Sequence, residues 1–130
     1  MIHCIIVEDA PLAVDKLKNF ISKVPLLDLV GTFDNGLDAF DFLQSNTIDL
    51  LFLDIQMEQF TGIQLLKALH TRPHIIITSA YGEYAVEGFE YDVTDFLLKP
   101  YSVERFLTAG TKVQKELAST PPAQPHPKEY

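Results

Sequence analysis

The chain has 130 residues, of which 47% are hydrophobic, so it is long enough for one domain with one substantial core. Its net charge of -8 argues against a chain that binds nucleic acid by itself, because phosphate binding needs clustered Lys and Arg. The single cysteine, Cys4, excludes a disulfide framework, and the start MIHCIIVED lacks the basic region of a signal peptide. No apolar run approaches the roughly 20 residues of a membrane span, so we expect a cytoplasmic protein.

Five short apolar runs predict strands. In chain order they are IHCIIV (2–7), LDLVGTF (27–33), DLLFLD (49–54), HIIIT (74–78) and VTDFLLK (93–99). Three of the five are almost continuously apolar, which is typical of strands covered on both faces in a parallel sheet.

The segments between the runs predict helices, because their apolar residues fall at helical spacing. These residues are Leu17, Phe20, Ile21 and Val24, then Ile63, Leu66 and Leu69, and finally Phe106, Leu107, Val113 and Leu117. The alternation of strand and helix predicts a (βα)5 chain, which is a doubly wound α/β domain with a five-stranded parallel sheet.

Helix boundaries carry their own signals. Pro11 suits a first helical turn, and Thr61 and Ser102 suit N-caps. Pro25 and Pro73 end the segments that they follow. We predict that the folded domain covers residues 1–118.

The C-terminal segment has a different composition. STPPAQPHPKEY (119–130) holds four prolines and almost nothing to bury. It predicts an extended, semi-rigid linker of about 3 Å per residue. We expect this linker to lead to an output domain beyond it.

Polar side chains follow the predicted strands at the point where each one ends. The first strand ends in Glu8 and Asp9, and the third ends in Asp54. The fourth delivers Thr78, and the fifth delivers Lys99. In open α/β sheets ligands bind outside these carboxyl ends, so we expect the five side chains to lie at one edge.

Each of these residues has a simpler explanation when it is taken alone. An acid after a strand often caps the next helix, a β-branched Thr favours strands, and a lone Lys is commonly a surface charge. Their joint placement favours a site, because capping does not call for three crowded carboxylates, which repel one another unless a cation is present.

The cation that suits these carboxylates is Mg2+, which prefers hard oxygen ligands. Mg2+ beside an Asp, a Lys and a Thr suits phosphoryl transfer onto a carboxylate. Asp54 would attack phosphorus, Lys99 would neutralise charge on the equatorial oxygens, and the Thr78 hydroxyl would donate a hydrogen bond to one of them.

Histidines offer a competing metal site. His70 and His74 are four residues apart, but Pro73 lies between them and argues against a shared helical face that would hold zinc. His3 lies within the first strand, where we expect it to be packed or hydrogen-bonded.

Residues 1–118 resemble the receiver domain of a two-component response regulator. The motifs that carry the resemblance are VED (7–9), LDIQM (53–57) with Gly62 eight residues after Asp54, TSA (78–80) and DFLLKP (95–100). The resemblance implies the flavodoxin-like strand order 2-1-3-4-5 and a phosphoryl group that passes from a histidine kinase to Asp54.

The resemblance also implies a role for each residue around Asp54. Asp9 and Asp54 would bind Mg2+ directly, Glu8 would act through water, and Gln56 would offer its backbone carbonyl. A cis bond between Lys99 and Pro100 would aim Lys99 at the site.

In such receivers phosphorylation acts as a switch. Thr78 would move toward the phosphoryl group, and Phe96 would turn inward behind it. The simpler interpretation of Phe96 is a plain core or surface aromatic. The face that changes would be helix four, strand five and helix five, on which the family commonly forms homodimers.

A narrower resemblance lies in TSAYGEYAVEGFEYDVTDFLLKP (78–100). It is similar to regulators whose output is a LytTR-type DNA-binding domain that controls transcription. The implied partners are a sensor histidine kinase and the chain's own C-terminal output domain, while the acidic receiver contacts neither DNA nor a membrane itself.

Three other readings compete with an active receiver. An FMN-binding flavodoxin needs a phosphate-cradling loop after the first strand, where VEDAPLA has two acids. A haloacid dehalogenase-type phosphatase needs DxDx[TV] after the first strand, which is absent. A degenerate receiver that only binds partners usually lacks a member of the acid–Asp–Thr–Lys set.

One departure from the family is Glu58, which stands where Pro is usual and could attract Mg2+ or point into water.

Overall fold

The fold is described from a computed structural model in which residues 1–57, 62–70, 72–80 and 92–119 are placed. The strands are β1 (Ile2–Val7), β2 (Leu27–Phe33), β3 (Leu50–Asp54), β4 (His74–Ser79) and β5 (Asp95–Leu98). The helices are α1 (Pro11–Ser22), α2 (Gly36–Ser45), α3 (Gly62–Ala68) and α5 (Val103–Ser119). The predicted helix between β4 and β5, the predicted N-cap Thr61, Glu58 and the linker from residue 120 lie outside the described residues.

The five strands form one parallel sheet in the order β2-β1-β3-β4-β5, which confirms the predicted fold class and strand order. The register aligns Val7 with Leu53 and Asp54 with Thr78. The carboxyl ends of β1, β3 and β4 therefore lie together at one edge, as expected for parallel strands.

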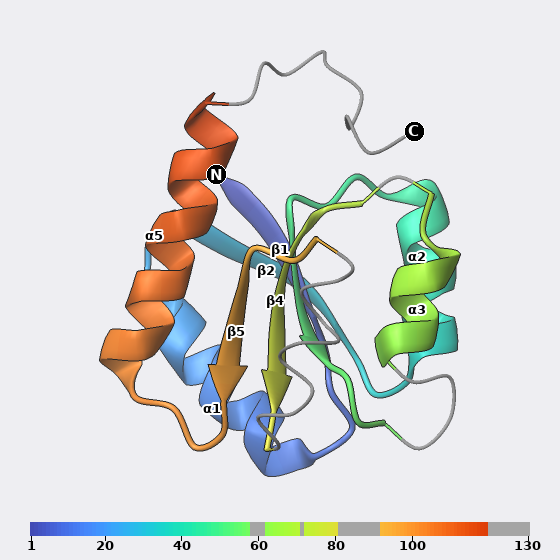
Figure 1. The fold of residues 1–130 in the computed structure, drawn as a ribbon, viewed down its shortest axis with the longest axis horizontal. Coiled ribbons are helices and arrows are strands. Elements are labelled where there is room, and N and C mark those ends of the chain that lie inside the picture. Colours follow the sequence, from blue (N-terminus) through green and yellow to red (C-terminus); the bar gives the residue numbers. More distant parts are fainter. Residues whose placement is uncertain (58–61, 71, 81–91, 120–130) are drawn as a thin grey trace.

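Helices cover both faces of the sheet, with α1 and α5 on one face and α2 and α3 on the other (Figure 1). Aromatic rings pack on the face under α1 and α5, where Phe106 of α5 stacks on Phe52 of β3 with ring centroids 5.7 Å apart. The central strand β3 is buried along its whole length, which explains why its sequence shows no alternation of polar and apolar residues.

Two of the predicted helix starts are confirmed. Pro11 is the first residue of α1, and the backbone N–H of Arg105 donates to Ser102 Oγ at 3.1 Å, so Ser102 caps α5. The helix α1 ends at Ser22, so Val24 lies outside it, because the residue before Pro25 disfavours helical backbone.

The fifth strand is shorter than predicted, because its regular pairing with β4 covers only Asp95–Leu98. After it, Lys99 still donates its backbone N–H to the carbonyl of Ser79 at 2.7 Å, but Pro100 has no N–H with which to continue. None of the described helices is long and apolar enough to cross a membrane.

Candidate functional site

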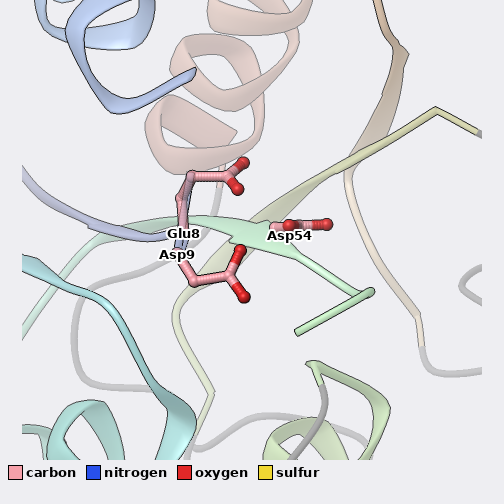
Figure 2. Close-up of side chains that lie close together, drawn as sticks. All are labelled: Glu8, Asp9 and Asp54. Carbon is pink, nitrogen blue, oxygen red and sulfur yellow. The ribbon is translucent and has the colours of Figure 1, made fainter. Parts of the chain in front are cut away.

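Three carboxylates meet at the carboxyl edge of the sheet. Glu8 and Asp9 follow the last residue of β1, and Asp54 is the last residue of β3. Because Val7 pairs with Leu53, the next residues along the two strands, Glu8 and Asp54, lie side by side. One carboxylate oxygen from each of the three lies within 4.8 Å of the other two (Figure 2).

Two of these acids are buried and one is open to solvent. Glu8 is 2% exposed and Asp54 is 5% exposed, whereas Asp9 is exposed. Burial and the neighbouring Asp54 carboxylate raise the pKa of Glu8 to about 7, although Lys99 acts in the opposite direction. The site therefore disfavours a full set of ionised carboxylates and has a deficit of positive charge.

Lys99 supplies a cation to this group. Its Nζ lies 2.8 Å from Glu8 Oε1 and 3.8 Å from Asp54 Oδ2. The peptide bond between Lys99 and Pro100 is cis, as the family resemblance implied. Lys99 thus reaches both buried acids from the end of β5.

The hydroxyl of Thr78 lies at the same edge, since Thr78 of β4 is the register partner of Asp54. Thr78 is 1% exposed, and its Oγ1 has no hydrogen-bond partner within the described part of the chain. A buried hydroxyl without a partner costs about 1–3 kcal/mol, so it commonly marks a place where a ligand supplies the acceptor.

Gln56 contributes through its main chain and its side chain. Its backbone N–H donates to Asp54 Oδ1 at 3.0 Å, and its side-chain Oε1 accepts from Ser79 Oγ at 3.4 Å. Neither contact was predicted from the sequence. Serine directly after Thr78 at a strand end was a weak signal, but its pairing with Gln56 depends on the β3–β4 register. The role of the Gln56 carbonyl as a metal ligand stays a prediction.

Phe96 lies on β5 as expected, three residues before Lys99. It is half-buried and packs against the hydrophobic cluster on the face of the sheet that α2 and α3 cover. Its register partner is Ile77, one residue before Thr78. Phe96 is therefore close to Thr78 along the sheet, while the residues from 81 to 91 that precede β5 lie outside the described part.

The donor set fits Mg2+ rather than a softer metal, because all three candidate ligands are carboxylates. Two of the histidines, His3 and His74, are engaged elsewhere. His74 Nδ1 lies 3.1 Å from Thr94 Oγ1 and 3.2 Å from Glu116 Oε1, and His3 Nδ1 lies 3.0 Å from Asp28 Oδ2. His3 is thus hydrogen-bonded, as predicted.

Comparison with known proteins matches the chain to one family. The model of the response regulator receiver domain matches residues 4–111. The transcriptional regulatory protein YpdB of Escherichia coli K12 is 39% identical over 127 residues, which cover 92% of this chain and 52% of YpdB. The sensory transduction protein LytT of Bacillus anthracis is 34% identical over 122 residues, which cover 92% of this chain and 50% of LytT. The chain therefore spans about half the length of these curated relatives.

A solved structure is similar over the whole fold. The response regulatory domain of MrkE from Klebsiella pneumoniae superposes with a TM-score of 0.84 at 36% identity, and the match covers 92% of this chain and 100% of that domain. The receiver domain of AraT from Geobacillus stearothermophilus superposes with a TM-score of 0.81 at 25% identity, over 89% of this chain and 95% of that domain.

Proposed function

The chain belongs to the response regulator receiver domain family, a signalling module, and from this premise we propose that Asp54 accepts a phosphoryl group from a sensor histidine kinase. One observation carries the proposal. Asp54 is a buried carboxylate that lies near two further acids, an ammonium group and the hydroxyl of its register partner Thr78, which has no hydrogen-bond partner among the described residues.

The transfer makes one bond and breaks one bond. A carboxylate oxygen of Asp54 attacks phosphorus, an O–P bond forms, and the P–N bond to the kinase histidine breaks, so the electron pair returns to that imidazole nitrogen. Lys99 Nζ, 3.8 Å from Asp54 Oδ2, offsets negative charge on the transferred group. The Thr78 hydroxyl donates to a phosphoryl oxygen and so gains the partner that it lacks within the described residues.

Mg2+ is the cofactor that this site supports. Asp9 and Asp54 would hold it by their carboxylates, Gln56 by its backbone carbonyl and Glu8 through water. Three carboxylate oxygens within 4.8 Å of one another, with burial opposing the ionisation of Glu8, support this choice. When bound, Mg2+ neutralises charge on the acids and on the phosphoryl oxygens.

Phosphorylation acts as a switch in this proposal. Thr78 moves toward the phosphoryl group, and the half-buried Phe96 ring turns inward behind it. Because Phe has no hydroxyl that could hold the ring outside, packing alone drives this rotation. We expect the surface that responds to comprise β5, α5 and the predicted helix between them and β4, which lies outside the described residues, and to support a homodimer of the phosphorylated chain.

The output is transcription control by a LytTR-type DNA-binding domain that follows the linker 119–130, and the receiver acts in the cytoplasm. The similarity to YpdB and LytT, of which this chain covers about half, supports this part of the proposal.

Light scattering before and after phosphorylation tests the proposed homodimer, and an unchanged molecular mass would contradict it.

Intact-mass spectrometry after incubation with Mg2+ and acetyl phosphate tests the phosphoacceptor. We expect one phosphoryl adduct on the native protein and on Asp41→Asn, which removes an exposed carboxylate of α2, and none on Asp54→Asn. An adduct that survives Asp54→Asn contradicts the assignment. Absence of any adduct, with Mg2+ binding also absent in calorimetry, favours a module that binds partners without phosphorylation, and rapid turnover of unrelated phosphate esters favours a phosphatase.

A further inference from the structure

The strand β5 lies at the end of the sheet, so one of its edges has no neighbouring strand among the described elements. Alternate residues of a parallel strand direct their main-chain N–H and C=O groups to opposite edges. Lys99 continues the pairing toward β4, because its N–H donates to the Ser79 carbonyl at 2.7 Å. Phe96, three residues earlier, therefore directs both of its main-chain groups to the outer edge.

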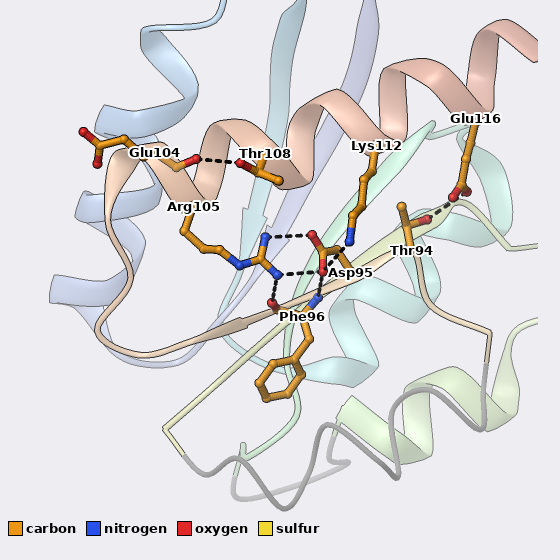
Figure 3. Close-up of polar contacts among 8 residues, drawn as sticks. All are labelled: Thr94, Asp95, Phe96, Glu104, Arg105, Thr108, Lys112 and Glu116. Atoms are coloured by element: carbon orange, nitrogen blue, oxygen red, sulfur yellow. Dashed lines mark hydrogen bonds and ion pairs between the residues drawn. The ribbon is translucent and has the colours of Figure 1, made fainter.

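Two side chains satisfy these outward groups of Phe96. Its N–H donates to Asp95 Oδ1 at 2.8 Å, and its carbonyl accepts from Arg105 Nη2 at 2.8 Å. The same guanidinium donates to both carboxylate oxygens of Asp95, each at 2.8 Å (Figure 3). Asp95 and Arg105 thus take the place that a neighbouring strand would have at this position.

The contact is specific to Arg105. The side chain of Asp95 is only 4% exposed, and a carboxylate at such a site has to be paired. Lys112 gives the same carboxylate a second cation at 3.3 Å, but only Arg105 among the described residues is hydrogen-bonded to the Phe96 carbonyl. A planar guanidinium can bind a carboxylate with two hydrogen bonds and still reach a third acceptor, whereas an ammonium group acts as a point charge.

This clamp lies just ahead of the site. Only Leu97 and Leu98 separate Phe96 from Lys99, and the Phe96 ring extends from β5 on the side away from α5 (Figure 3). Arg105 belongs to the first turn of α5, where Ser102 caps its backbone N–H at 3.1 Å. The contacts of Arg105 with Asp95 and Phe96 therefore join the two ends of the segment 95–105. This segment carries Lys99, whose ammonium group lies 2.8 Å from Glu8.

We propose that Arg105 is a positioning residue for the phosphoacceptor site: by clamping Asp95 and the Phe96 backbone to α5, it holds Lys99 against Glu8 and Asp54. The proposal rests on the phosphoacceptor role of Asp54. The clamp acts on the backbone alone, so it keeps Lys99 in place while the Phe96 ring is free to change its rotamer.

A double-mutant cycle tests this coupling. The variants are Arg105→Gln, Lys99→Ala and the combination, and the readout is the rate of Asp54 phosphorylation by acetyl phosphate at saturating Mg2+. We expect Arg105→Gln to slow the native protein at least about tenfold, because a misplacement of about 1 Å can cost about 100-fold in rate. In the Lys99→Ala background the same change should slow the reaction by less than about twofold, since no ammonium group is left to position.

The matched control is Lys112→Ala, which removes a cation from the same carboxylate without touching Phe96, and we expect its rate to stay near the native one. Arg105→Lys should recover stability to urea but not rate, because it keeps the charge and loses the fork geometry. Mg2+ affinity gives an independent readout. We expect it to be unchanged or tighter in Arg105→Gln, since Lys99 competes with the cation for Glu8 and Asp54, whereas partial unfolding would weaken it.

Three results would overturn the inference. They are equal slowing by Arg105→Gln in both backgrounds, equal slowing by Lys112→Ala, or a weaker Mg2+ affinity that parallels the lost rate. Failure of the proposed function is separate, because in that case the native protein itself acquires no adduct on Asp54.

Discussion

Gly62 is the residue at which a single methyl group should do most harm to the site. A Cβ added there would lie 2.5 Å from the Cα of Ile55 and 2.7 Å from the carbonyl oxygen of Asp54. Both atoms belong to the backbone of Asp54 and of the residue after it, so neither can turn aside as a flexible side chain would. Since ordinary contacts lie near 3.5–4.0 Å, the start of α3 or the end of β3 has to move by about 1 Å.

The expected cost of Gly62→Ala follows from this overlap. Overpacking of this kind costs about 1–3 kcal/mol, and the better helix propensity of Ala returns less than about 1 kcal/mol. At a typical urea slope of about 2 kcal/mol per M, a net loss of about 2 kcal/mol lowers the urea midpoint by about 1 M. We also expect slower phosphorylation, because the displaced backbone carries Asp54.

Gly110→Ala is the matched control. It makes the same substitution within α5, at a position where an added Cβ meets nothing within 4 Å. There the change should raise stability by about 0.5–1 kcal/mol, since Gly is the poorer helix former. Urea unfolding followed by circular dichroism measures both variants. If Gly62→Ala matches the native midpoint, or if both variants shift in the same direction, the close-approach argument is wrong.

Three further predictions concern the rest of the domain. Burial acts to raise the pKa of Asp95, but hydrogen bonds from Arg105 and Phe96 and the charge of Lys112 outweigh it, so that pKa lies below its usual value. The stability that Asp95 contributes is therefore complete above about pH 4 and is lost as the pH falls through the folded pKa, so the advantage over Asp95→Asn in urea unfolding should shrink below pH 4; a constant difference would refute this. Burial raises the pKa of the Cys4 thiol to about 12, so a thiol reagent at neutral pH should modify Cys4 only in urea, and rapid labelling of the native chain would contradict its burial. Phe106→Ala removes a fully buried ring stacked on Phe52 and should cost about 3–5 kcal/mol in the same assay, whereas a cost below about 1 kcal/mol would show that the core collapses around the gap.

Local patterns in the sequence were enough to place most elements. The short apolar run before Asp54 is typical of a strand that is covered on both faces of a parallel sheet, and Ser102 caps α5 through a contact only three residues away. The same patterns placed Glu8, Asp9, Asp54, Thr78 and Lys99 at strand ends, and parallel strands necessarily bring their carboxyl ends to one edge. That edge and its acidic character were therefore predictable.

Only the tertiary structure decided which of these groups touch and which partners hold them. The contact of Lys99 with Glu8 joins residues 91 positions apart, and no periodicity encodes which of several nearby acids an ammonium group will choose. Strand register and helix packing likewise decide the solvent exposure of Asp9 beside the buried Glu8 and the contact of Arg105 with Phe96. They also leave the Thr78 hydroxyl without a hydrogen-bond partner in the part of the chain that the structure describes. Sequence patterns reflect which residues are buried, because burial repeats with the period of each element. A site depends instead on distances between distant segments that must be right to within a few tenths of an ångström, and only the packed chain defines these distances.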